Sequence, residues 1–527
     1  MNNARMSNGG KRQADFSYCR GVFRGASTRP NHGWRWIPVI AVVPLLFSAE
    51  SASAEKELMP TSQFARLGYE GYGRAMAAAS DTILVAALQD TFIKTGGFIS
   101  FGDWVEVLRF DGVDSTSVAG LFPVGGDSSD DHIYDRDDFG ASVSVSPTGM
   151  RAVVGAPLHD ELAKDAGAVH VFSAHESSWF QVTTLFDFDG AQAGDRFGAA
   201  TAMSGGFLAV GAPGNASTGD RPGAIRLYEL CNWFYCFEQT LRPPEGVRSV
   251  GRALATDGNT LVAGALLDPK SGPVNRNGVV LIYSRDPSKP KGEQWELARM
   301  IQPDGLTPQS QFGATVVLDS DPHRTIVVGA PGQAVGEQRG KGTAFVYRQT
   351  EDDWVLVQRV FPPVLDSPFL PADASGQSLA LADGVLLVGS NWTPENPEAI
   401  GSAHAFRFDG SLWIRTAVRT PPAGSSDRAG VFGTSVAVSH GQAVVGAPGR
   451  EDDHPVPGAV FRFPIPVSIG AGGSGESFLD RTERFVGCLT GPLSADHPVV
   501  TECAGFDENV DGDVDLLEAA IIQRAPH

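Results

Sequence analysis

The chain has 527 residues, 42% hydrophobic and 19% charged, so it contains enough apolar material for a folded core. Its formal net charge of −20 argues against general binding to nucleic acid, which needs clustered Lys and Arg side chains. The 62 glycines and 35 prolines indicate many turns, and exclude neither a single large domain nor several small ones.

Residues 1–54 have the organisation of a secretory signal peptide. Arginines precede an apolar run from Trp36 to Phe47, and Ala52-Ser53-Ala54 supplies a small-residue cleavage pattern. A membrane anchor is the alternative interpretation. However, the run is shorter than the ~20 residues that a spanning helix needs, and it contains Pro38 and Pro44. We therefore expect a secreted protein, extracellular or at the cell surface, with no membrane span.

One unit recurs seven times between residues 55 and 466. Each copy has a glycine, a short alternating run, a tight turn, and a second apolar run that ends in Gly-Ala-Pro or a variant. Four clear copies begin at Phe139, Phe197, Phe312 and Phe432, and three weaker ones at Tyr72, Val250 and Ser375. The leading glycines are Gly73, Gly140, Gly198, Gly251, Gly313, Gly376 and Gly433.

Each unit is expected to form four strands. After the first hairpin, a third strand opens with a glycine such as Gly167, Gly223 or Gly342. Tryptophan marks the fourth strand, at Trp104, Trp179, Trp233, Trp295, Trp354 and Trp413. Seven four-stranded units predict an all-β, seven-bladed β-propeller. A many-stranded sandwich is the alternative, and seven matched units argue against it.

The last copy lacks its fourth strand. After Gly458 the chain enters PIPVSIGAGGSG instead of a tryptophan strand. Residues Ala54 to Gln63 precede the first copy and have no other evident partner. We expect them to supply the missing outer strand, which closes the ring and removes an exposed sheet edge.

The order of strands predicts where a ligand binds. Loops between second and third strands lie on the same face of a propeller as the connections between blades. The long ones are residues 110–138, 158–166, 266–277, 332–341, 391–400 and 449–457. Because binding residues are usually carried on loops held by a rigid scaffold, we expect an unknown protein or glycan ligand on this face.

The Phe-Gly and Gly-Ala-Pro signatures resemble FG-GAP repeats, the units of the integrin alpha-subunit propeller and of many bacterial exported proteins. The resemblance implies a binding or cell-adhesion function. Integrin-type blades often carry an acidic calcium loop between their first two strands. Here the corresponding turns, such as SPTGM, SGG and TDGN, have too few ligands for Ca²⁺. We therefore expect no calcium in the blades.

A calcium loop is instead predicted near the C-terminus. A Gly/Ser-rich linker, 467–477, leads into the segment 478–527, where FDENVDGDVDLLEAAIIQR fits D-x-[DN]-x-[DN]-G-x5-E. The predicted Ca²⁺ ligands are Asp507, Asn509, Asp511, Asp513, Asp515 and Glu518. Alternate oxygens converge, Asp513 offers its carbonyl, and Glu518 closes the shell with both carboxylate oxygens. A solvated acidic tail is the alternative.

A helix is expected only after this loop, and the arrangement resembles a dockerin module. The resemblance implies docking or anchoring through a cohesin-like partner. Dockerins carry two such loops, whereas the upstream half of this segment, FLDRTERFVGCL from Phe478, keeps only a helix-like pattern.

Four cysteines remain after the signal, and they fall into two local groups. An even number in an exported chain predicts disulfides. Of the three connectivities, proximity favours Cys231–Cys236 and Cys488–Cys503.

The sequence contains no G-x-S-x-G, H-E-x-x-H or P-loop motif, so we expect no enzyme. An exported carbohydrate-active enzyme that degrades polysaccharide is the alternative, because dockerin-like tails accompany such enzymes. One acidic cluster, with His132 and Arg136 among its carboxylates, is either an ion or ligand site or a solvated loop. Its carboxylates are Asp127, Asp130, Asp131, Asp135, Asp137 and Asp138.

Overall fold

The chain divides into two compact units, Met1–Ala52 and Ser53–His527. The computed structural model describes only parts of the second. These are the backbone of 56–58 and residues 71–87, 103–110, 114–123, 137–175, 178–188, 190–214, 222–267, 277–320, 324–335, 340–351, 353–360, 374–391, 401–421, 431–439, 442–449 and 458–465. The predicted signal peptide, the linker and the segment 478–527 lie outside the described residues.

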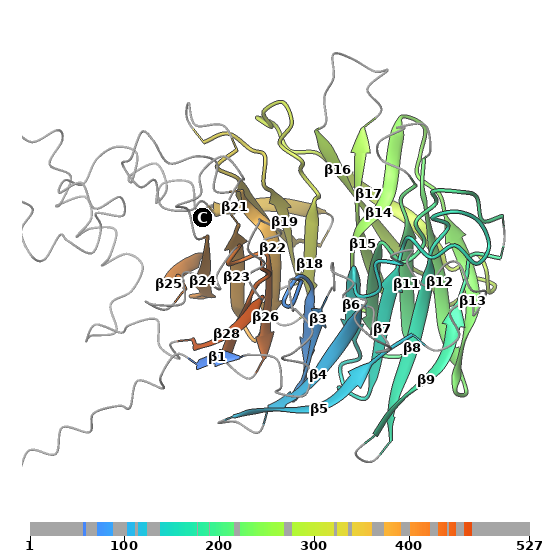
Figure 1. Ribbon diagram of the computed structural model, residues 1–527. Helices are drawn as coiled ribbons and strands as arrows, with labels where there is room; N and C mark the ends of the chain where they lie inside the picture. The colour runs from blue at the N-terminus through green and yellow to red at the C-terminus, as the bar shows by residue number, and fades with distance from the viewer. Residues whose placement is uncertain are drawn as a thin grey trace, which may run out of the picture. The chain divides into compact units, whose positions relative to one another are not determined.

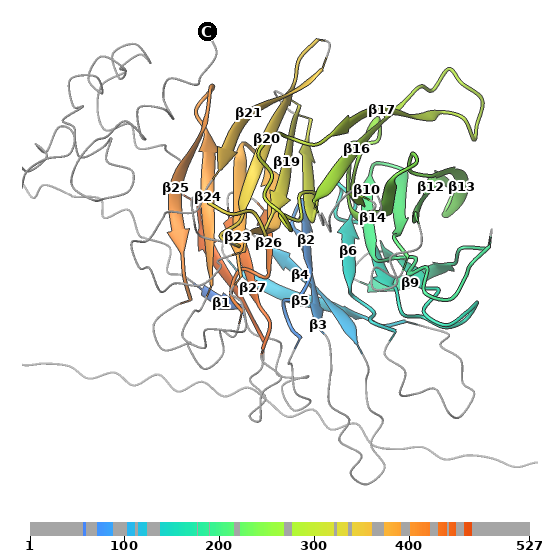
Figure 2. The same cartoon turned by 90° about the horizontal axis from the view of Figure 1, so that it is seen from above.

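The described residues form seven four-stranded antiparallel sheets, the blades of a β-propeller (Figures 1 and 2). Blade 1 contains β2 (Met76–Ala79), β3 (Thr82–Ala87), β4 (Trp104–Phe110) and β5 (Ser115–Leu121). Blade 2 contains β6 (Ser142–Val145), β7 (Arg151–Ala156), β8 (Ala168–His175) and β9 (Ser178–Leu185). Blade 3 contains β10 (Ala200–Ser204), β11 (Phe207–Ala212), β12 (Ala224–Cys231) and β13 (Phe234–Leu241).

Blade 4 contains β14 (Val247–Thr256), β15 (Thr260–Leu267), β16 (Gly278–Arg285) and β17 (Trp295–Ile301). Blade 5 contains β18 (Thr315–Asp319), β19 (Thr325–Ala330), β20 (Thr343–Gln349) and β21 (Trp354–Val360). Blade 6 contains β22 (Ser375–Ala382), β23 (Val385–Ser390), β24 (Ser402–Phe408) and β25 (Trp413–Arg419). Blade 7 contains β26 (Ser435–Ser439), β27 (Gln442–Ala447), β28 (Ala459–Pro464) and the N-terminal β1 (Lys56–Leu58).

The core lies between the blades. The first strand of each blade contacts that of the next around the whole ring, including β26 of blade 7 with β2 of blade 1. The second strands are buried on both faces, as in TILVAA of β3 and FLAVGA of β11, because each blade packs against two neighbours. This two-sided burial explains why these strands are continuous apolar runs.

The two signature glycines of the repeat contact each other across the blade interfaces. A Cβ atom on Gly155 of blade 2 would lie 2.0 Å from the carbonyl oxygen of Gly198 of blade 3. Gly198 itself has a φ of +92°, which a residue with a side chain rarely adopts. Gly446 of blade 7 and Gly73 of blade 1 repeat this contact, with a Cβ on Gly446 only 2.1 Å from the Gly73 oxygen. These backbones approach so closely that only glycine fits at both positions. The same contact between Gly446 and Gly73 joins the last blade to the first.

The N-terminal residues complete the last blade, as the sequence predicts. Strand β1 pairs antiparallel with β28, with Lys56 opposite Arg462 and Leu58 opposite Val460. Figure 1 shows β1 beside β28 at the outer edge of that sheet. Blade 7 is thus built from both ends of the described chain.

The prediction that tryptophan marks every fourth strand is wrong at two positions. Trp104 begins the third strand β4 and stacks on Phe122, with ring centroids 6.1 Å apart. Trp233 lies in the turn between β12 and β13 with 72% of its surface exposed. Tyr235 instead takes the buried place in β13. The other four tryptophans do lie in fourth strands, where a large ring covers the neighbouring blade.

Candidate functional site

Strand topology assigns the loops of the propeller to two faces. We call the face with the second-to-third loops and the connections between blades the loop face, and the opposite one the turn face. The prediction that residues 110–138 form one long loop is wrong, because they include β5. Its sequence STSVAGL has no tryptophan and weak apolar alternation, so the pattern gave no strand signal. Of this range, only residues after Leu121 belong to the loop face.

Two neighbouring segments of the loop face are joined into one structure. They are residues 157–167, between β7 and β8, and residues 186–198, between blades 2 and 3, of which the structure describes all but residue 189. Three main-chain hydrogen bonds of 2.8 to 3.0 Å join the N–H groups of Gly194, Arg196 and Phe197 to the carbonyls of Lys164, Asp165 and Ala166. We call these two segments the blade-2 platform. These bonds hold the two segments together at residues 164–166 and 194–197.

Phe188 is the most exposed large apolar side chain of this platform, with 76% of its surface accessible. Its ring meets the edge of Phe186 at a centroid distance of 5.7 Å. Phe186 in turn packs against His159, 5.6 Å away, which is itself buried. Two rings, those of Phe186 and His159, therefore support an aromatic side chain that faces solvent.

A buried ion pair fixes the chain beside Phe188. The Asp187 carboxylate lies 2.6 Å from a guanidinium nitrogen of Arg226 on β12, and both side chains are buried. Arg226 also donates to the Thr240 hydroxyl. Removing one member of such a pair leaves a buried charge uncompensated, which costs about 3–5 kcal/mol. The pair thus ties the platform to the body of blade 3.

Two histidines, His159 of the platform and His170 of β8, have ring centroids 6.1 Å apart. His170 is buried, and its Nδ1 lies 3.3 Å from the Thr184 hydroxyl. Burial, together with the nearby His159, lowers the pKa of His170 to about 4, so the ring is neutral at physiological pH. His159 Nε2 lies 3.8 Å from an Asp137 carboxylate oxygen.

The structure describes only two members of the predicted acidic cluster. Asp137 faces His159, and Asp138 forms an ion pair of 2.9 Å with Arg74 of blade 1. Asp127, Asp130, Asp131 and Asp135 lie outside the described residues, as do His132 and Arg136. The two described carboxylates therefore have protein partners, and the ion-site prediction for the whole cluster stays a prediction.

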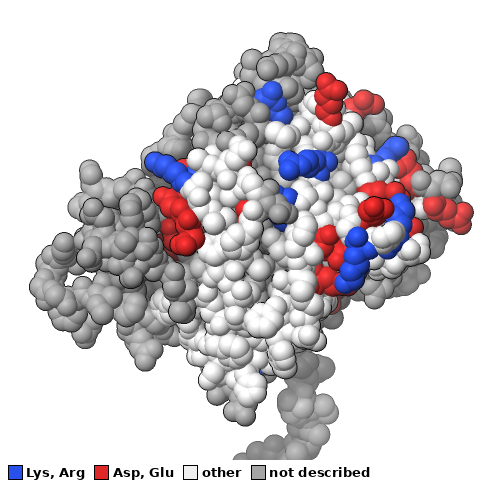
Figure 3. All heavy atoms as spheres, turned by 90° about the vertical axis from the view of Figure 1, so that its right-hand side faces the viewer, with Lys and Arg blue, Asp and Glu red and all other residues white. Residues whose placement is uncertain are grey.

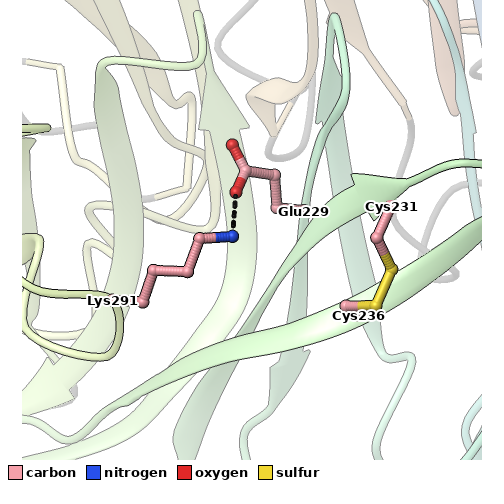
Figure 4. Close-up of a disulfide and its surroundings, with 4 residues drawn as sticks. All are labelled: Glu229, Cys231, Cys236 and Lys291. Carbon is pink, nitrogen blue, oxygen red and sulfur yellow. Dashed lines mark hydrogen bonds and ion pairs between the residues drawn. A yellow bond between two sulfur atoms is a disulfide. The ribbon is translucent and has the colours of Figure 1, made fainter.

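Cys231 and Cys236 form a disulfide across the hairpin of β12 and β13, with Cα atoms 5.9 Å apart. Figure 4 shows this bond beside Glu229, which accepts from Lys291 of blade 4 at 3.2 Å. Hydrogen bonds from Arg285 and Lys291 lower the pKa of Glu229. The hairpin tip exposes Trp233 and Phe234. Figure 3 shows a broad uncharged surface on this side of the molecule.

The predicted calcium ligands lie outside the described residues, and so do Cys488 and Cys503. Within the segments that the structure describes, no group of three or more His, Cys, Asp or Glu side chains is arranged to hold a metal ion. No helix long and apolar enough to cross a membrane occurs in those same segments.

Sequence patterns did not single out Phe188 or the Asp187–Arg226 pair. One signal was present: the alternating strand AIRLYELC places Arg226 among apolar residues. A charged residue at such a position needs a buried partner. Sequence alone does not say that the partner is Asp187, since it lies 39 residues away on another blade's connection.

The chain is thus a seven-bladed β-propeller with an aromatic platform on its loop face. Residues 130–172 and 179–228 match the family model of the FG-GAP repeat, and these two stretches cover the platform and its supports. FG-GAP repeats are typical of extracellular or surface proteins. A search of the curated proteins finds no match.

Solved structures similar to this chain are distant. They include a putative 6-phosphogluconolactonase from Bacteroides fragilis, with 11% identity and a TM-score of 0.42 over 73% of this chain and 89% of that one. Hydrazine synthase from Kuenenia stuttgartiensis has 12% identity and a TM-score of 0.40, over 72% and 92%. The β-propeller domain of the Trilobed protease from Pyrococcus furiosus has 8% identity and a TM-score of 0.38, over 74% and 94%. Values this low carry no argument about function.

Proposed function

We propose that this protein is an exported binding protein of the adhesion type, whose propeller holds a protein or glycan ligand on its loop face. The observation that carries the proposal is Phe188, which is 76% exposed although its ring packs on Phe186 and the preceding Asp187 is held by a buried ion pair with Arg226. Exposed aromatic anchors on a preorganised backbone contribute strongly to binding, because little conformational entropy is lost on association. The platform has this character, and the matched FG-GAP repeats agree with a binding scaffold.

An array of glycans and extracellular proteins, probed with the chain from residue 55 onward, tests this proposal. The Phe188→Ser variant should weaken binding of any ligand found by about 10-fold or more, as hot-spot residues do. Met150→Ser is the matched control, because Met150 is 40% exposed but lies in a turn of the turn face. Equal loss in both variants, or release of reducing ends from a polysaccharide on the same array, would argue against a binding platform.

We further propose that the C-terminal segment binds one Ca²⁺ and serves for docking or anchoring through a cohesin-like partner. The support is the sequence pattern of Asp507, Asn509, Asp511, Asp513, Asp515 and Glu518. Calorimetry on the whole chain should give a stoichiometry near one. Glu518→Gln should weaken binding strongly, since it removes the charge of the bidentate ligand. Several bound ions would instead mean that the blades or the acidic cluster bind calcium.

A further inference from the structure

Side-chain amides join the outer strands of some neighbouring blades. Gln239 of blade 3 donates to the carbonyl of Trp295 in blade 4 (2.8 Å) and accepts from its N–H (2.9 Å). Gln358 of blade 5 makes the same pair of bonds to Trp413 of blade 6, at 3.0 and 2.8 Å. We call this arrangement the amide clamp. Each clamp occupies the main-chain N–H and C=O of one tryptophan, both on the side of the outer strand that faces away from its own sheet.

The register identifies the equivalent position at the other interfaces. Gln239 is paired with Leu227, and Gln358 with Val346, each directly before a register shift. Arg299 is the equivalent residue of blade 4, and it forms an ion pair of 2.8 Å with Asp353, beside Trp354. These three interfaces are therefore each bridged by a side chain from this position.

The interface between blades 1 and 2 lacks the bridging side chain. Ala119 pairs with Val107 directly before the register shift, so it holds the clamp position of blade 1. Trp179 pairs with Ala174, as Trp295 pairs with Arg285 and Trp413 with Phe408. Alanine has no side-chain amide, so it cannot hold the Trp179 main chain as the two glutamines hold theirs.

A groove of about 440 Å³ lies at this interface. It is lined by Gly120, Leu121, Phe122, Phe172 and the β9 residues Trp179 to Thr183, none of which is charged. Leu121 and Phe172 are buried, while Phe180 is half exposed. A Cβ on Gly120 would lie 2.9 Å from the Phe122 ring, so glycine allows this ring its place against Trp104. The groove is aromatic, and its volume suits a side chain or small group.

We propose that this groove binds an extended peptide segment of a partner protein along the outer edge of β9. One residue of an extended chain presents its N–H and C=O on the same side, as a carboxamide presents its donor and acceptor. The peptide main chain takes the place at Trp179 that the glutamine amides take at Trp295 and Trp413. An uncharged apolar side chain of the peptide enters the groove. Strand β9 is outermost in its sheet, so its outer edge is not paired within that sheet. This site is separate from the loop-face platform.

Installing the clamp provides the test. Ala119→Gln should close the groove with the bonds seen at two other interfaces, without loss of stability. Ala417→Gln is the matched control: Ala417 has the same register position in blade 6, whose neighbour blade 7 has β1 as its outer strand. Linear peptides selected from a random 12-residue display library on the chain from residue 55 onward serve as the probe. Their affinities are then measured for all three proteins.

We expect the selected peptides to contain an apolar residue and to bind the wild type and Ala417→Gln with equal affinity. Their affinity for Ala119→Gln should be at least 10-fold lower. Equal binding to Ala119→Gln, failure to select any peptide, or binding of neutral oligosaccharides in the groove instead would overturn the proposal. Hydrogen exchange on the wild type gives a second readout that does not depend on variants. The segment 178–183 should gain protection on peptide binding, and unchanged exchange there would also overturn it.

Discussion

At the residue scale, one position of each third strand decides how the blade interface is filled. It is the residue that pairs with the one directly before the signature-glycine position of the second strand, as His170 pairs with Val154 before Gly155. Its side chain packs toward the preceding blade, as Phe345 does in a cluster with Val262 and Val280 of blade 4. The position is apolar in blades 4, 5 and 7, with Leu281, Phe345 and Phe461, and polar in the others, with Glu106, His170, Arg226 and His404. Each polar member is buried and has a hydrogen-bond partner: Tyr72, Thr184, Asp187 and Ser402, respectively. These partners offset part of the cost of desolvation, because each residue also keeps one buried polar atom without a hydrogen bond among the described residues.

The buried histidines should make the fold sensitive to mild acid. Burial lowers the pKa of His170 and His404 to about 4 in the folded chain, against about 6.5 when unfolded. The unfolded chain therefore takes up protons first, and the stability that the two histidines contribute falls as the pH drops from about 6.5 to 4 and then levels off. Each histidine contributes on the order of 3 kcal/mol to this loss.

His170→Phe should remove the share of the pH dependence that belongs to His170. The ring of His170 lies 5.3 Å from Phe139. In blades 5 and 7 the equivalent ring pairs are Phe312–Phe345 and Phe432–Phe461, so a phenylalanine at position 170 copies a pair that this fold already contains. Urea unfolding at pH 7 and pH 4.5 measures the difference. We expect a clearly smaller loss of stability in the variant, with His404 among the groups that supply what remains. An identical loss in both proteins would mean that His170 does not titrate in this range.

At the element scale, the inner and outer strands of a blade differ in how well sequence predicts them. Inner strands follow from the glycine signatures, since Gly155 and Gly198 meet at a distance that allows no side chain. Outer strands depend on the neighbouring blade, and tryptophan marks them only where the neighbour accommodates the ring. Strand β5 has Ser115 where β17 has Trp295, which is why its position could not be predicted. The clamp position had no local sequence signal, because its partner is about 55 residues away.

The amide clamp should contribute measurably to stability. Gln358→Leu removes two hydrogen bonds and leaves the N–H and carbonyl of Trp413 without this partner. We expect a loss of about 1–3 kcal/mol in the free energy of unfolding. Gln349→Leu is the control, because Gln349 is exposed at the end of β20 and should change stability by less than about 0.5 kcal/mol. Equal effects in urea denaturation would show that the clamp adds nothing beyond a surface hydrogen bond.

At the scale of the whole molecule, sequence predicted the seven blades, the N-terminal strand in blade 7 and the Cys231–Cys236 bond. Repetition made the prediction of the blades possible, since seven copies average out local ambiguity, whereas the disulfide followed from the proximity of its two cysteines in the sequence. The blade-2 platform and the groove at Ala119 could not be predicted, because each depends on contacts between different blades. Phe188 illustrates the limit: in sequence it is one of 30 phenylalanines, and only the fold makes it exposed.

The blade-2 platform and the groove at Ala119 both depend on a ring held closed by β1, so closure is the central structural claim. Only three residues of β1 pair with β28, and without them the edge of β28 is open to other chains. Deleting residues 54–63 from the chain that begins at residue 54, followed by size-exclusion chromatography and calorimetry, measures this dependence directly. We predict a lower melting temperature and aggregation. A monomer that melts at the same temperature as the full chain would contradict closure by the N-terminal strand.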